Sequence, residues 1–154
     1  MEAATAKRKP KRFTRKVTKF DLATADTTKL KKIYGIGSTL SARIVKFRDR
    51  LGGFHSMEQV KEVYGLKPEV AERLIKASYL GTKKVQQLPI NQLDAQGLGK
   101  HPYVSYKLAK VLYYYREQHG PYRLPKDLDG IRMLSPEDRK RLIPYIDWSV
   151  EESQ

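Results

Sequence analysis

The residues best suited to chemistry are Gly35, Ile36 and Gly37, which form a Gly-x-Gly turn, with Ser38 and Thr39 directly after it. A glycine turn that opens a helix exposes successive backbone N–H groups beside the positive end of the helix dipole. Such amides can bind an anion such as a phosphate group. Side chains at the two glycine positions would hold the anion away, so glycine at both is favourable for binding.

The apolar pattern around this turn predicts two helices joined by a hairpin. Leu30 and Ile33 are three residues apart before the turn, and Ile44 and Val45 continue a helical spacing after it. Ser41 is small at the point where the two helices of a tight hairpin must cross. Gly35 can supply a positive φ at the end of the first helix.

This unit occurs four times in the chain. A shift of 68 residues aligns 22–77 with 90–145 without a gap, and a shift of 30 aligns the two units of each half. At the two glycine positions the later units have Gly65 and Lys67, then Tyr103 and Ser105, then Met133 and Ser135. Binding geometry is therefore predicted to be best in the first unit, possible in the second and degraded in the last two.

The segment LKKIYGIGSTLSARIVKFRDRLGGFHSMEQVKEVYGLKPEVAERLIK, residues 30–76, resembles the tandem helix-hairpin-helix domain of the bacterial ComEA family of DNA-uptake proteins. The resemblance covers 21–80 well and 88–146 more loosely. It implies an all-α fold of two tandem (helix-hairpin-helix)2 domains, similar to SAM-like folds and to domain 2 of RuvA. We expect a basic arm at 1–19, a first domain at 20–80, and a linker plus a second, degenerate domain at 81–154.

The same resemblance implies binding of double-stranded DNA across the minor groove, without sequence preference and through its phosphate backbone. Hairpin amides around Gly35, Ile36 and Gly37 would contact the phosphates. The supporting residues would be Ser38, Thr39, Lys32 and Arg43 in the first hairpin unit and Gly65 and Lys67 in the second. Further positive charge near the first hairpin would come from Lys31, Lys46, Arg48 and Arg50.

The charge of the chain is consistent with a polyanionic partner but does not identify one. With 31 Lys and Arg against 17 Asp and Glu, the formal net charge is +14. Residues 1–19 hold eight basic residues against Glu2, a net +7, and lack helical or strand periodicity, so we expect a flexible arm that binds phosphates non-specifically. The absence of cysteine excludes disulfides, thiol catalysis and Cys-ligated zinc.

Two other functions remain open on the sequence. The chain could be a protein-interaction scaffold, with the second domain contacting a protein partner, or it could bind RNA through its arm. No catalytic residues, metal ligands, cofactor or small-molecule substrate are predicted, because no nucleophile–base pair, P-loop or metal triad occurs. No signal or membrane segment is found, while ComEA-like proteins are often exported or attached to the envelope, so localisation stays unassigned.

The tyrosine run 113–115 is the one aromatic cluster that suggests base stacking. Under the 68-residue shift, Tyr113 and Tyr115 replace Val45 and Phe47, so we expect these two rings in the core. Tyr114 replaces Lys46 and is the ring expected on the surface, for stacking or for a protein interface.

Overall fold

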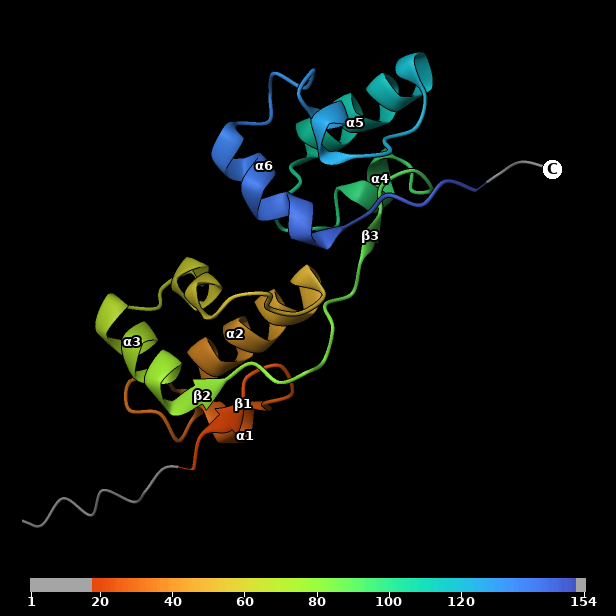
Figure 1. Cartoon of the computed structure of the whole chain (residues 1–154). Coiled ribbons are helices and arrows are strands. Elements are labelled where there is room, and N and C mark those ends of the chain that lie inside the picture. Colours follow the sequence, from red (N-terminus) through yellow and green to blue (C-terminus); the bar gives the residue numbers. More distant parts are fainter. Residues whose placement is uncertain (1–17, 152–154) are drawn as a thin grey trace, which may run out of the picture.

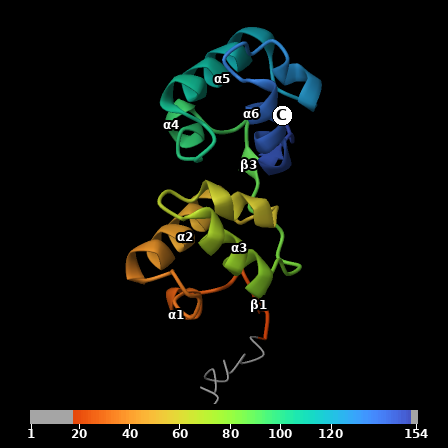
Figure 2. The ribbon, with the colours of Figure 1, turned by 90° about the vertical axis from the view of Figure 1, so that its left-hand side faces the viewer.

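The computed structural model describes residues 18–151, which form two similar helical halves joined end to end (Figures 1 and 2). The first half consists of β1 (Phe20–Asp21), α1 (Thr27–Leu30), α2 (Ser38–Leu51), the 3-10 helix η1 (Met57–Glu62), α3 (Pro68–Ala77) and β2 (Ser78–Tyr79). The second half consists of β3 (Leu88–Pro89), α4 (Ala95–Leu98), α5 (Tyr106–His119), η2 (Pro125–Leu128), α6 (Pro136–Leu142), η3 (Ile143–Tyr145) and β4 (Ile146–Asp147).

The predicted fold class, helical with two tandem helix-hairpin-helix domains, is confirmed. Most of the predicted basic arm lies outside the described residues. None of the helices between residues 18 and 151 is long and apolar enough to span a membrane.

The first helix of each domain begins at an equivalent aspartate, and glycine and a capping box mark other helix ends. The side chain of Asp26 accepts a hydrogen bond from the N–H of Lys29 at the start of α1, and Asp94 does the same for Gly97 at the start of α4. Gly52 ends α2 with a φ of 85°, which places it in the left-handed region that glycine adopts without strain. The Ser-x-x-Gln spacing of Ser56 and Gln59 is typical of a capping box, and such a box begins η1.

A pair of two-residue strands joins the ends of each domain, a feature that the sequence patterns do not predict. β1 is parallel to β2, with Phe20 opposite Ser78, and β3 is parallel to β4, with Leu88 opposite Ile146. Each pair brings the first and last segments of its domain together. Strands this short have no periodicity to recognise, which is why the prediction was purely helical.

Each domain has its own apolar core, built at the helix crossings. Ile44 and Leu74 are fully buried in the first domain, and Leu112 and Leu142 are their counterparts in the second. The small residues at the crossings, Ser41, Ala71 and Ala109, are also fully buried, as a close helix approach requires.

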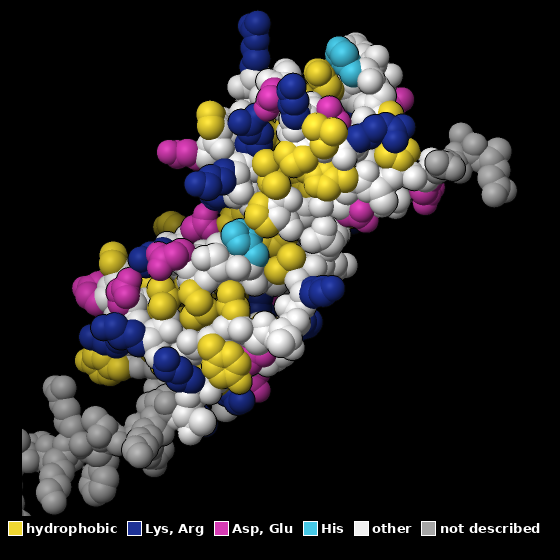
Figure 3. Space-filling model, in the orientation of Figure 1, with side chains coloured by type: hydrophobic (Ala, Val, Ile, Leu, Met, Phe, Trp, Pro, Cys, Tyr) yellow, Lys and Arg dark blue, Asp and Glu magenta, His cyan; other side chains and the backbone are white. Residues whose placement is uncertain are grey.

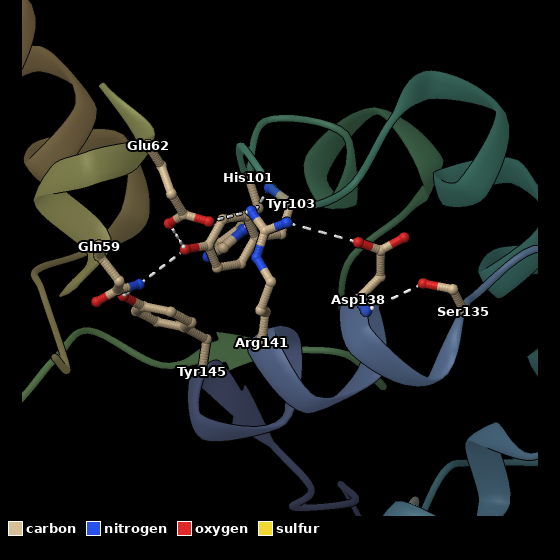
Figure 4. Close-up of polar contacts among 8 residues, drawn as sticks. All are labelled: Gln59, Glu62, His101, Tyr103, Ser135, Asp138, Arg141 and Tyr145. Carbon is tan, nitrogen blue, oxygen red and sulfur yellow. Dashed lines mark hydrogen bonds and ion pairs between the residues drawn. The ribbon is translucent and has the colours of Figure 1, made fainter. Parts of the chain in front are cut away.

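Polar side chains connect the two domains through one shared cluster (Figure 4). Gln59 Nε2 donates to the hydroxyl oxygens of Tyr145, at 2.8 Å, and Tyr103, at 2.9 Å. The Tyr145 hydroxyl donates to the carbonyl of Gly53 at 2.7 Å, and its fully buried ring belongs to the first domain's core. Glu62 accepts a hydrogen bond from Tyr103 and forms an ion pair with Arg141, so η1 is held against the second domain.

Candidate nucleic-acid interface

The first hairpin is a tight turn that requires glycine at one position. Ile36 N–H donates to the carbonyl of Ile33 at 3.0 Å, which closes a four-residue turn. Its third residue, Gly35, has a φ of 95°, the conformation of a type II turn. A Cβ on Gly35 would lie 2.7 Å from Cγ2 of Val70, so both backbone conformation and packing against α3 require glycine there.

Gly37 is not required by the fold in the same way. Its φ is −98°, which any residue can adopt, and a Cβ placed on it would have no neighbour within 4 Å among the described residues. The backbone of Gly37 is therefore open to an external group, and a side chain there would occupy the space that such a group needs.

The start of α2 leaves backbone donors without acceptors. Gly37 supplies no side-chain cap, and the first N–H to bond within the helix is that of Ser41, to the carbonyl of Gly37. No acceptor within residues 18–151 is found for the amides of Gly35, Gly37, Ser38, Thr39 and Leu40. The Ile36 amide was also expected to contact phosphate. In the structure this amide closes the turn instead, and the Ile36 side chain is buried in the core.

The second hairpin resembles the first but offers fewer amides. Gly65 has a φ of 80°, so the turn conformation is retained, and Lys67 precedes α3 without a side-chain cap. Pro68 begins the helix and has no N–H, and Glu69 adds a negative charge in the first turn. Lys67 places one positive charge where the first hairpin has only backbone.

In each hairpin of the second domain, a serine hydroxyl binds one amide at the start of the following helix. The Ser105 hydroxyl accepts from Leu108 N–H at the start of α5, and the Ser135 hydroxyl accepts from Asp138 N–H at the start of α6, each at 3.1 Å. In the third hairpin, Tyr103 N–H donates to Nδ1 of His101 at 3.1 Å. The helix starts of this domain are thus capped internally, in contrast to α2.

The two hairpins of the first domain brace each other. Nη1 of Arg73, on α3, donates to the carbonyl of Tyr34 at 3.3 Å, and Nη1 of Arg43, on α2, donates to the carbonyl of Tyr64 at 3.2 Å. Each guanidinium also lies over the ring of the same tyrosine, 5.0 and 5.1 Å from its centroid. Each helix therefore holds the turn of the other unit.

This brace changes the interpretation of Arg43. The sequence suggested a phosphate contact, whereas in the structure its guanidinium contacts Tyr64 at the tip of the second hairpin. The second domain keeps only part of this arrangement: Arg43 and Tyr34 are replaced there by Val111 and Pro102, while Arg141, the counterpart of Arg73, lies over the ring of Tyr103 at 4.2 Å. The only trace of it in the sequence is that Arg43 and Arg73, like Tyr34 and Tyr64, correspond at a shift of 30 residues, which does not show that these side chains meet.

The basic side chains near α2 separate into two groups. Lys31, Lys32, Lys46 and Arg50 are exposed and make no ion pair within residues 18–151. Arg48 was expected to add charge near the hairpin, and that expectation is wrong: its side chain is 11% exposed and donates to the carbonyls of Leu22 and Ala25.

Arg116 of the second domain makes the same contacts as Arg48, to the carbonyls of Ile90 and Leu93 at 2.7 and 2.8 Å. These two arginines attach the segment before the first helix of each domain to its longest helix. Their conservation between the two repeats thus has a structural cause, not an electrostatic one.

Charge alone does not mark a binding face in this protein. On the face shown in Figure 3, Lys and Arg side chains are interspersed with Asp and Glu.

No group of three or more His, Asp and Glu residues in the described part could hold a metal ion. The strongly shifted pKa values belong to buried groups of the cores and the domain contact, His101, Tyr122 and Tyr145, and not to the two hairpins of the first domain.

Comparison with protein families agrees with this geometry. The model of the helix-hairpin-helix motif matches residues 15–79 and again residues 83–147. No curated protein and no solved structure matches the chain. Helix-hairpin-helix motifs generally bind nucleic acid, and two matches together cover most of the sequence. The chain therefore belongs to the helix-hairpin-helix motif family.

Proposed function

We propose that the protein binds double-stranded DNA without sequence preference, through backbone amides of the first hairpin that contact phosphates on the minor-groove side. The observation that carries this proposal is the start of α2: among the described residues, no acceptor is found for the amides of Gly37, Ser38, Thr39 and Leu40, and no atom would contact a Cβ on Gly37. A phosphate placed there would accept several hydrogen bonds at the positive end of a 14-residue helix.

The charges around this site favour an anionic ligand such as phosphate. Lys31 and Lys32 precede the hairpin and are exposed, as are Ser38 and Thr39. Contacts to phosphate position a protein on a duplex but carry no sequence information, so we expect little preference among base sequences. The second hairpin, through Gly65 and Lys67, would make a weaker contact of the same kind.

In this proposal the protein acts by binding and not by catalysis, in a process that handles DNA, such as uptake of the ComEA type or repair. The second domain would contribute little to duplex binding, because its helix starts are capped by Ser105 and Ser135.

The test is a titration of labelled duplex DNA with the parent, with Gly37→Val, and with a deletion of residues 1–19, each at several salt concentrations. Gly37→Val should stay folded and bind the duplex at least tenfold more weakly, because a side chain keeps phosphates away from the amides. Deletion of the arm should lower the salt dependence but leave the effect of Gly37→Val in place.

Ser105→Val is the matched control, since it places the same side chain at the equivalent position before α5. It should lower stability by about 1 kcal/mol through loss of the cap and leave duplex affinity unchanged. Equal duplex affinity of Gly37→Val and the parent would refute the hairpin site. If only deletion of the arm weakened duplex binding, the binding would be due to the charged arm and not to the hairpin. Tighter binding of an RNA duplex of the same length would favour RNA as the partner.

A further inference from the structure

α5 of the second domain carries an exposed row of aromatic and basic side chains that the duplex site does not use. Tyr106 is 68% exposed and Tyr114 is 61% exposed. Tyr106, Lys110, Tyr113 and Tyr114 follow helical spacing, so they share one side of the helix. At a rise of 1.5 Å per residue the row extends about 12 Å along the helix axis. Figure 1 shows α5 in the second domain, away from α1 and the start of α2.

Cations lie directly over two of these rings. Nζ of Lys110 is 4.5 Å from the centroid of Tyr106, and the guanidinium of Arg116 is 5.1 Å from the centroid of Tyr113. Tyr113 meets Tyr114 edge to face at 5.5 Å, which fixes the orientation of the exposed ring. The expectation that Tyr113 belongs to the core is wrong, because its ring packs on this surface pair. Tyr115 does pack against the core, as expected.

The helical framework does not need this row. The first domain has the same fold and places Ser38, Ala42, Val45 and Lys46 at the corresponding positions. None of these residues is aromatic, although α2 and α5 have the same length. The aromatic side chains are therefore an addition to the second copy, and core packing does not explain Tyr106 and Tyr114.

The aromatic and basic side chains of this row indicate which kind of partner it would bind. Lys107 and Lys110 are exposed, and the nearby acid Glu117 is paired with Arg116 at 3.8 Å, so the surface carries net positive charge. Lysine is depleted from the centres of protein–protein interfaces, where it would lose hydration. Aromatic rings alternating with cations are instead suited to a polyanion that also presents flat aromatic groups, which describes unpaired nucleotides.

We propose that this face of α5 binds single-stranded nucleic acid, with unpaired bases stacking on Tyr106 and Tyr114 and phosphates contacting Lys107 and Lys110. The distance of about 12 Å between the two rings along the helix corresponds to roughly three to four stacked bases, because each base rises about 3.4 Å along a strand. Paired bases in a duplex have no free face, so this site is distinct in ligand and in position from the proposed duplex site on α2.

The test compares a labelled twenty-residue oligothymidine with an abasic oligomer of the same length and charge, using the full chain. The parent should bind oligothymidine more tightly, because only this probe can stack. Tyr114→Lys restores the residue of the first domain and adds a positive charge. Stacking predicts about tenfold weaker binding of oligothymidine by this variant, whereas attraction between charges alone predicts tighter binding.

A double variant, Tyr106→Ala with Tyr114→Ala, should lose the distinction between the two oligomers while keeping the parent's affinity for duplex DNA. Its control, Tyr106→Phe with Tyr114→Phe, keeps both rings and should bind within about threefold of the parent. The proposal is overturned if Tyr114→Lys binds oligothymidine as tightly as the parent, if the parent binds both oligomers equally, or if the double alanine variant loses duplex binding to the same extent.

Discussion

The guanidinium of Arg73 lies over the ring of Tyr34 and donates a hydrogen bond to that residue's backbone carbonyl, although the two residues belong to different hairpin units. The carbonyl and the following amide, that of Gly35, belong to one peptide plane. Holding the carbonyl toward α3 therefore also sets the direction of the Gly35 N–H. An arginine on α3 thus positions an amide of the proposed phosphate site before α2.

Arg73→Ala should weaken duplex binding about fivefold, the equivalent of roughly 1 kcal/mol for one charge-assisted hydrogen bond at the surface. Arg73→Lys should be affected almost as much, because an ammonium group cannot both stack on the ring and reach the carbonyl with a planar fork. Titration with duplex DNA measures both. Lys76→Ala removes the same charge from the same helix and is the control; an equal loss in this variant would mean that only charge matters.

Gly35 and Gly37 should respond differently to alanine. Gly35→Ala should lower the free energy of unfolding by about 2 kcal/mol or more, because a positive φ is unfavourable for alanine and its Cβ would meet Val70. Gly37→Ala should lower it by less than about 1 kcal/mol, since its φ and surroundings accept a Cβ. Chemical denaturation of both variants measures these changes. A similar loss of unfolding free energy in both would contradict the conclusion that the fold requires glycine at position 35 but not at position 37.

The helical elements and their repetition could be predicted because each unit repeats an apolar spacing that reports directly on helix faces. The small residue at the first helix crossing, Ser41, was predicted for the same reason, and the glycine that ends α2 and the capping box at Ser56 follow equally local rules. The likeness of the first two hairpins also followed from the alignment, since Gly35 and Gly65 both adopt the positive φ that their positions require.

Contacts between distant residues could not be predicted. Arg43, Arg48 and Arg73 were indistinguishable as surface cations in the sequence, yet two hold hairpin carbonyls and one holds the segment before α1. Tyr103 appeared only as a lost glycine, whereas its hydroxyl reaches Glu62 of the other domain. Which partner such a side chain meets depends on the placement of whole elements, and periodicity carries no information about that.

Tyr145→Phe should destabilise the contact between the domains. The Tyr145 hydroxyl accepts from Gln59 and donates to the carbonyl of Gly53, and its ring is fully buried, so the phenylalanine variant leaves buried polar groups without partners. We expect a loss of about 1–3 kcal/mol in the free energy of unfolding, measured by chemical denaturation. Tyr79→Phe, with an exposed ring, is the control and should unfold like the parent.

The stability of the protein should fall in mild acid because of His101. This residue is 6% exposed and packs against the rings of Tyr103 and Tyr145, and no hydrogen bond to its Nε2 is found among the described residues. Burial disfavours the charged imidazolium and lowers the pKa of His101 from 6.5 to about 4. Since the unfolded chain takes up the proton first, the stabilising contribution is complete above pH 6.5 and is lost as the pH falls toward 4.

Between pH 7.5 and pH 5, the parent should lose about 2 kcal/mol in the free energy of unfolding. Carboxyl groups ordinarily titrate below this window, so we assign most of the loss to histidine. His101→Ile introduces the residue found at the equivalent position in the first domain, Ile33, and removes the titrating group. Its free energy of unfolding should change much less over the same window. An equal loss in parent and variant would show that His101 does not control the acid sensitivity of the domain contact.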